Sequence, residues 1–291
     1  MATRFKLPYK LVFLAAIVAL ALVLDIYIET TLHGNPYDAR PLLGDPTLGV
    51  VGYYQGSMRN RVAASTALRL FRSVYPDAPL YIHYDGSRHD SQESWDMAVD
   101  FHATLVTYSD EPRDRSSKPI GMYFTVEAGK EYIRRLRAAA LLQPRGWVLL
   151  LEDDVWTWSQ VNRQSDLRYD ICGHCWLKYS DNHSNIIRKH SARNNIMPYK
   201  NATCYGGSGG SFVSSSRLIG LNMSSPRIHS LLENLVEDDM ASDLLLSAII
   251  LFDGGTIGWY KGYYDFVLVG FGYPRTFHHM KWLYFLKRWY G

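Results

Sequence analysis

Two runs of three consecutive acidic residues carry the most distinctive chemistry in this sequence. The first, Glu152-Asp153-Asp154, directly follows the apolar segment 147–151 (WVLLL). Adjacent carboxylates repel one another unless a positive charge lies among them. A hard divalent cation such as Mn²⁺ or Mg²⁺ takes oxygen ligands and bridges substrate phosphates. We therefore predict a metal site here, against the alternatives of a solvated acidic loop or a helix start stabilised by aspartates.

The second acidic run, Glu237-Asp238-Asp239, precedes an apolar segment with helical spacing that extends to Phe252. Aspartates at a helix start cap free backbone N–H groups and interact favourably with the helix dipole, which accounts for one of the three. The other two are candidates for chemistry. Between the two acidic runs, the segment 204–218 (CYGGSGGSFVSSSRL) contains four glycines, which allow the backbone to approach a ligand closely.

The segments that must position these residues alternate between apolar strands and amphipathic helices. Strands are predicted at 48–54, 78–84, 101–108 and 147–151, and helices at 61–75 and 122–142. This alternation is typical of an α/β fold with a mainly parallel sheet flanked by helices. In such sheets ligands bind beyond the carboxyl ends of the strands, where Asp85 and residues 152–154 both lie.

The N-terminal segment is predicted to lie outside the globular domain. Basic residues precede an apolar run at 11–28, which we interpret as a transmembrane signal anchor. A cleaved signal peptide is the alternative, but the candidate cleavage pattern Ala19-Leu20-Ala21 lies inside the apolar run. The predicted organisation is a cytosolic tail (1–10), the anchor (11–28), a stem rich in proline and glycine (29–46) and one catalytic domain (47–291).

The amino-acid composition limits the classes of function that this protein can have. The chain has 291 residues with 47% hydrophobic and 14% aromatic content, enough for a substantial core. Its net charge of +3, with both signs spread throughout, argues against a dedicated nucleic-acid binder. Three N-glycosylation sequons support a lumenal, surface location for their loops, at Asn182, Asn201 and Asn222.

The order of these motifs resembles type II membrane glycosyltransferases of the GT-A fold, especially the Fringe-like and core 1 β-1,3-galactosyltransferase-like group. Members of that group have an anchor, a stem, a nucleotide-binding half, a strand-end Asp-x-Asp (DXD) motif, a Gly-Gly-x-Gly segment, an acidic pair opening a helix, and a late histidine. The matching residues here are Glu152-Asp153-Asp154, Gly206-Gly207-Ser208-Gly209, Glu237-Asp238 and His278-His279. The resemblance covers residues 48–280 in motif order and spacing. A glutamate replaces the usual first aspartate, and the multiple disulfides common in the group are missing.

The resemblance implies a role for each matching residue. Asp154 would bind Mn²⁺ (or Mg²⁺), His278 or His279 would complete the metal shell, and Glu152 would contact the metal or the donor ribose. Asp238 would be the general base of an inverting displacement. The remaining residues implied at the donor are Asp85, Asp153, Gly206 and Gly207, and those at the acceptor or the helix start are Glu237, Asp239 and Trp156. The donor would be a nucleotide sugar such as a UDP-sugar, the acceptor a glycan or glycoprotein hydroxyl, and the location the Golgi or ER membrane.

The three cysteines support a competing interpretation. Cys172-Gly-His-Cys175 spells the active site of protein disulfide isomerases, so a lumenal thiol-disulfide oxidoreductase is an alternative function. That chemistry needs the first cysteine at a helix N-terminus, with a buried strand before it. The preceding segment is polar and turn-like, which favours a structural disulfide that involves Cys204. A zinc site formed with His174 is a third arrangement.

Two further classes stay open at this point. A relative that binds glycans without catalysis would keep the fold and lose the acidic metal motif, which is present here. Another metal-dependent phosphotransfer enzyme would use the same acidic motif on a different substrate.

Overall fold

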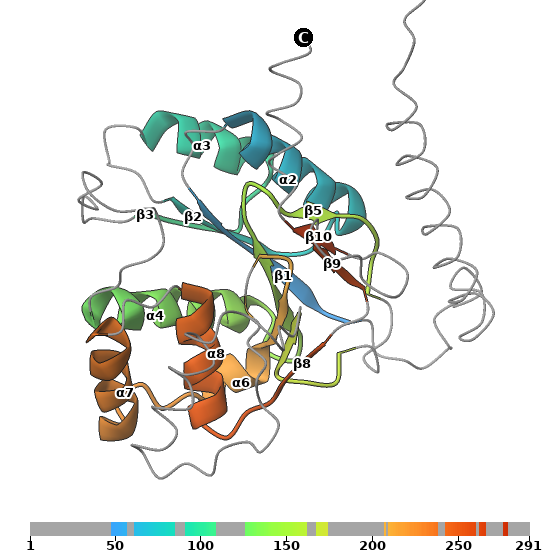
Figure 1. Cartoon of the computed structure of the whole chain (residues 1–291). Coiled ribbons are helices and arrows are strands. Elements are labelled where there is room, and N and C mark those ends of the chain that lie inside the picture. Colours follow the sequence, from blue (N-terminus) through green and yellow to red (C-terminus); the bar gives the residue numbers. More distant parts are fainter. Residues whose placement is uncertain are drawn as a thin grey trace, which may run out of the picture.

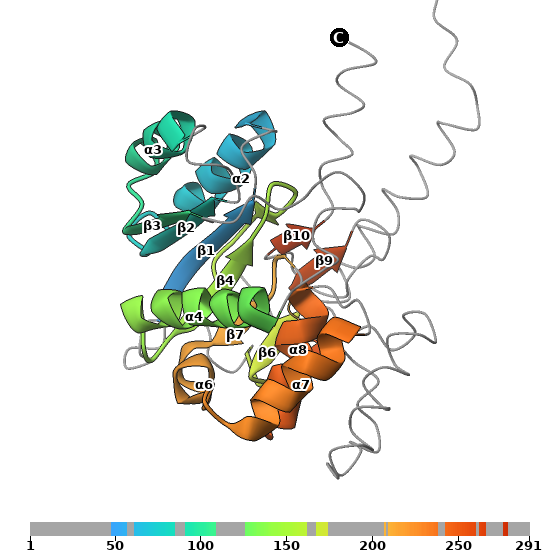
Figure 2. The ribbon, with the colours of Figure 1, turned by 90° about the vertical axis from the view of Figure 1, so that its left-hand side faces the viewer.

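The computed structural model describes residues 48–56, 61–84, 91–108, 126–161, 167–173, 207, 209–237, 242–259, 262–265 and 276–278. Two layers of helices enclose a central sheet in this part of the chain (Figures 1 and 2). No helix among these residues is long and apolar enough to cross a membrane. The predicted tail, anchor and stem (1–46) lie outside the described residues.

The central sheet has seven strands in the order β3-β2-β1-β4-β7-β6-β8. Its first four strands are parallel, and β7 runs antiparallel to both β4 and β6, which confirms the predicted mainly parallel α/β sheet. The parallel strands are β1 (Val50–Gly56), β2 (Leu80–Tyr84), β3 (Leu105–Tyr108) and β4 (Trp147–Leu151). The others are β6 (Ile171–Gly173), β7 (Phe212–Ser214) and β8 (Ile257–Trp259).

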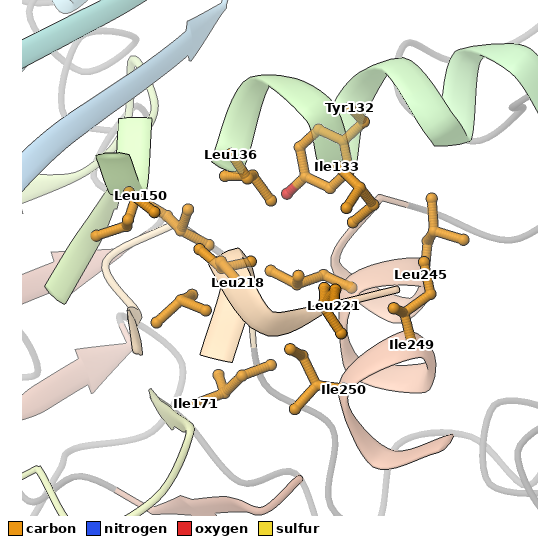
Figure 3. Close-up of a cluster of buried hydrophobic side chains, with 14 of the residues drawn as sticks. Tyr132, Ile133, Leu136, Leu150, Ile171, Leu218, Leu221, Leu245, Ile249 and Ile250 are labelled. Carbon is orange, nitrogen blue, oxygen red and sulfur yellow. The ribbon is translucent and has the colours of Figure 1, made fainter. Parts of the chain in front are cut away.

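Helices cover both faces of this sheet because its strands bury side chains on both sides. On one face lie α2 (Arg61–Val74) and α3 (Ser91–Asp100). On the other lie α4 (Val126–Leu142), α6 (Ser215–Gly220), α7 (Pro226–Glu237) and α8 (Ser242–Phe252). Successive strand residues alternate between the two cores: Tyr53 packs with the α4 layer and Tyr54 with the α2 layer. Figure 3 shows the core of the α4 layer, where Ile133 and Leu136 of α4 face Ile249 and Ile250 of α8.

A second, three-stranded sheet completes the described fold. It consists of β5 (Trp156–Thr157), β10 (Thr276–His278) and β9 (Tyr263–Asp265), with β10 in the centre. Strand β10 is antiparallel to β5 and parallel to β9. Since β5 begins two residues after Asp154, this small sheet brings the C-terminal part of the chain beside the first acidic run.

Candidate functional site

The first acidic run forms a tight turn at the carboxyl end of β4. The Val155 amide donates a hydrogen bond to the Glu152 carbonyl at 3.2 Å, which closes the turn. Asp154 is buried, with 1% of its surface exposed, whereas Glu152 and Asp153 are half-buried. The turn therefore holds one carboxylate in the interior and two at the margin, at the sheet edge where the sequence places the metal site.

The glycine-rich segment packs directly against this turn. An ideal Cβ added to Gly209 would lie 2.6 Å from Cγ2 of Val155 and 3.1 Å from Cδ of Glu152, so any side chain would have to displace the turn. The Gly210 amide donates to the Leu150 carbonyl at 2.7 Å. Gly207 and Gly210 have φ values of 95° and 85°, which residues other than glycine rarely adopt. Glycine is thus needed here both for space and for backbone conformation.

The small sheet encloses the turn from another side. Phe277 pairs with Trp156, so the antiparallel register places the backbone of His278 opposite Val155. The buried Thr276 hydroxyl donates to the Gly210 carbonyl at 3.0 Å. Three segments far apart in sequence, at 152–157, 209–210 and 276–278, therefore meet at one end of β4.

Several predicted site residues lie outside the described part of the chain: Asp85, Gly206, Asp238, Asp239, His279, Cys175, Cys204, Asn182 and Asn201. Asp85 directly follows β2, and Asp238 directly follows Glu237, the last residue of α7. Asn222 is exposed, as its sequon predicts, and its side-chain oxygen accepts a hydrogen bond from the Ser224 amide at 3.2 Å.

The side chains at the turn carry the type of ligand atom that a hard divalent cation binds. Glu152 and Asp154 supply carboxylate oxygens, the preferred ligand atoms of Mn²⁺ and Mg²⁺. The absence of a side chain at Gly209 lets the glycine segment lie directly against the Glu152 carboxyl group. Within the described ranges, no group of three or more His, Cys, Asp or Glu side chains that could hold a metal ion occurs.

Asp265 is a residue that the sequence does not single out. It ends β9 in register with His278, which ends β10. The strands of the small sheet have only two or three residues each, too few for a hydrophobic period, so no sequence pattern indicated this pairing.

A buried polar cluster on α4 and β2 was also missed. A helical hydrophobic period assigns charged residues to the solvent side, yet Arg135 of α4 is only 7% exposed. Its Nη1 lies 2.6 Å from Nε2 of His83, which is completely buried. Nδ1 of His83 lies 2.9 Å from the Thr107 hydroxyl, which lies 2.7 Å from the Tyr81 hydroxyl. Burial raises the pKa of Tyr81 above its ordinary value, so the phenol stays protonated.

Cys172 differs from both cysteine predictions. It is a free, fully buried thiol within β6, between β7 and β8, and therefore forms no disulfide. Burial raises the pKa of Cys172 to about 12, so the reactive thiolate is not formed near neutral pH. A strand interior also lacks the helix dipole that activates redox cysteines. Cys172 is therefore not a member of the predicted disulfide, whose other candidates, Cys175 and Cys204, lie outside the described residues, and its burial in a strand argues against the redox alternative.

Comparison with known proteins gives similarity in structure only. No model of a known protein family matches the sequence, and no curated protein matches it. The galactosyltransferase LgtC, solved with donor and acceptor sugar analogues, is similar with a TM-score of 0.46 and 11% identity, over 75% of each chain. The mannosyltransferase Ktr4p from S. cerevisiae has a TM-score of 0.42 and 14% identity, over 75% of this chain and 70% of its own. The bifunctional glycosyltransferase WbbM has a TM-score of 0.43 and 9% identity, over 82% of this chain and 46% of its own.

The packing of Gly209 against the acidic turn can be tested through stability. We expect Gly209→Ala to lower the free energy of unfolding by about 1–3 kcal/mol, because the added methyl group must displace Val155. Gly220→Ala is the matched control, since a Cβ there meets no atom within 4 Å. Urea unfolding of both variants measures the difference. Equal stability of the two variants would contradict the close packing.

The buried state of Cys172 predicts its reactivity. At pH 8 a thiol with a pKa near 12 is ionised to about one part in ten thousand, and burial also blocks reagents. We expect iodoacetamide to leave Cys172 unmodified in the native protein and to alkylate it in 6 M guanidinium chloride, as measured by peptide mass spectrometry. Rapid alkylation of native Cys172 would restore the redox interpretation.

Proposed function

We propose that this protein is a metal-dependent glycosyltransferase of the GT-A fold. It transfers a sugar from a nucleotide donor, a UDP-sugar, to a hydroxyl group of a glycan or glycoprotein. One observation carries the proposal: the acidic turn at the end of β4, Gly209 and the strand that ends at His278 meet at one sheet edge. The order of these motifs in the sequence resembles their order in that group of enzymes. Parallel sheets also bind ligands at this edge.

The chain's own residues supply a defined chemistry at that edge. Asp154 and Glu152 would hold Mn²⁺ or Mg²⁺, with His278 as the proposed third ligand. The bound cation would supply charge neutralisation to the leaving diphosphate. Burial of Asp154 excludes water from one side of the site, and the glycine at 209 lets its segment pack against Glu152 and hold the turn in place.

The acceptor side of the proposed reaction depends on the second acidic run. Asp238 follows α7 directly and is proposed as the general base, which removes the proton from the acceptor hydroxyl as that oxygen attacks the sugar carbon. Attack from the face opposite the leaving group inverts the configuration. Glu237, Asp239 and Trp156 are proposed to contact the acceptor.

The setting of the enzyme is proposed from sequence features. The apolar segment 11–28 would anchor the chain in the Golgi or ER membrane as a type II protein, with the catalytic domain in the lumen. The exposed position of Asn222 supports N-glycosylation of that domain.

Asp154→Asn tests the metal role with little change in side-chain volume. We expect at least about a 100-fold loss of Mn²⁺-dependent UDP release from a panel of UDP-sugars, since one charged ligand is lost. EDTA should abolish release by the unmodified protein. Asp100→Asn, at the exposed end of α3, is the matched control and should keep full activity. Tight glycan binding without turnover of any donor would instead indicate a non-catalytic glycan-binding protein.

Asp238→Asn tests the base separately from the metal. Transfer to acceptor should fall by at least about 100-fold, whereas affinity for the donor and for Mn²⁺ should be unchanged, because the base acts only on the acceptor hydroxyl. Calorimetry measures the two affinities and a coupled assay measures transfer. Full transfer activity in this variant would rule out Asp238 as the base.

A further inference from the structure

Arg135 is a buried cation whose hydrogen-bonding capacity is largely unused. It lies in the middle of α4 with 7% of its surface exposed. A guanidinium group has five N–H donors, but among the described contacts only Nη1 makes a hydrogen bond, to the ring of His83. Its Nε is fully buried with no hydrogen-bond partner. The protein therefore holds a positive charge in its interior with most of its donors unpaired.

His83 does not neutralise this charge. Because Nε2 of His83 accepts a hydrogen bond from Arg135 at 2.6 Å, that nitrogen carries no proton. The ring proton then lies on Nδ1, which donates to the Thr107 hydroxyl at 2.9 Å. His83 is thus a neutral acceptor that fixes the orientation of the guanidinium group. Within the described residues, no carboxylate forms an ion pair with Arg135.

Arg134, the preceding residue on the same helix, shows the usual environment of a charged side chain. Arg134 has 60% of its side chain exposed and forms an ion pair with Glu131 at 3.4 Å. Removing a charge from water without an ion partner is strongly unfavourable. An apolar residue at position 135 would stabilise the packing of α4 more than an unpaired charge does. We therefore take the charge as a sign that this position binds a ligand of opposite charge.

The strand register places this charge close to the proposed active site. His83 pairs with Gln55, and Tyr54, which precedes Gln55, pairs with Leu151, which precedes Glu152. His83 and Glu152 therefore lie in one row across the sheet, two strands apart, or about 10 Å between backbones. A nucleotide sugar bound at the acidic turn is long enough to span this separation.

We propose that Arg135, oriented by His83, binds an oxyanion of the sugar donor. This inference rests on the proposed glycosyltransferase function and extends it with a second, metal-independent anion contact. Guanidinium groups bind phosphate and carboxylate in a bidentate manner, so the oxyanion belongs either to the donor phosphates or to the carboxylate of a uronic acid sugar.

The experiment replaces Arg135 with methionine, which has a similar length and no charge. Arg134→Met is the matched control on the same helix. We expect Arg135→Met to have a Tm at least equal to that of the unmodified protein, because an uncompensated charge is removed. Calorimetry with Mn²⁺ and UDP, UDP-glucose or UDP-glucuronic acid should show at least about a tenfold weaker Kd for Arg135→Met. Arg134→Met should bind as the unmodified protein does. Arg135→Lys, which keeps the charge, should lose less affinity.

The ligands distinguish the source of the oxyanion. Weaker binding of UDP itself assigns the contact to the phosphates. Unchanged binding of UDP, together with loss of a preference for UDP-glucuronic acid over UDP-glucose, assigns it to the sugar carboxylate. Unchanged affinity for all three ligands in Arg135→Met overturns the proposal, while metal-dependent UDP release would still support the glycosyltransferase function.

A thermal-unfolding measurement without metal covers the opposite case, in which the anion site exists but the glycosyltransferase function fails. Pyrophosphate should raise the Tm of the unmodified protein and of Arg134→Met, but not that of Arg135→Met. If no nucleotide binds and this difference is still seen, the anion site stands and the glycosyltransferase function fails. If neither nucleotide nor pyrophosphate binds the unmodified protein, both proposals fail.

Discussion

The candidate site depends on one residue, Gly210, whose backbone makes hydrogen bonds to two different sheets. Its amide donates to the Leu150 carbonyl near the end of β4, and its carbonyl accepts from the Thr276 hydroxyl on β10. The Ser211 carbonyl accepts from the Leu150 amide at 2.9 Å and extends the same connection. Because these groups are buried, breaking any of these bonds would leave a polar atom unsatisfied in the interior. The acidic turn, the glycine segment and the small sheet are held in one arrangement by this connection.

The main sheet could be predicted from the sequence because its strands are short apolar runs separated by helical patterns. Residues 147–151 are apolar throughout, and all five are buried in β4. The acidic turn followed from the same reasoning, since the carboxyl end of a parallel strand is where ligands bind. That Gly209 lies against Glu152 was implied only by the resemblance in motif order, because no local pattern encodes a contact between residues 57 positions apart.

The features that were missed share a physical cause. Arg135 and His83 are polar residues in the interior, whereas an assignment from hydrophobic periodicity places polar residues on the surface. The spacing of Cys172 from Cys175 gave a redox pair as an alternative, whereas the reactivity of Cys172 is decided by its depth in β6. In each case the environment created by distant segments determines the chemistry of the residue.

The connection through Gly210 also has a consequence for biosynthesis. The acidic turn is complete in the chain once Val155 has been made, but Thr276 follows 121 residues later. Folding of the parallel strands β1 to β4 can precede the arrival of β10, since the pairings among these four strands involve only residues up to 151. The small sheet, in contrast, closes the longest loop in the described fold. A growing chain therefore carries its acidic residues unassembled until Thr276 has been made, so the assembled site reports that synthesis has passed this residue.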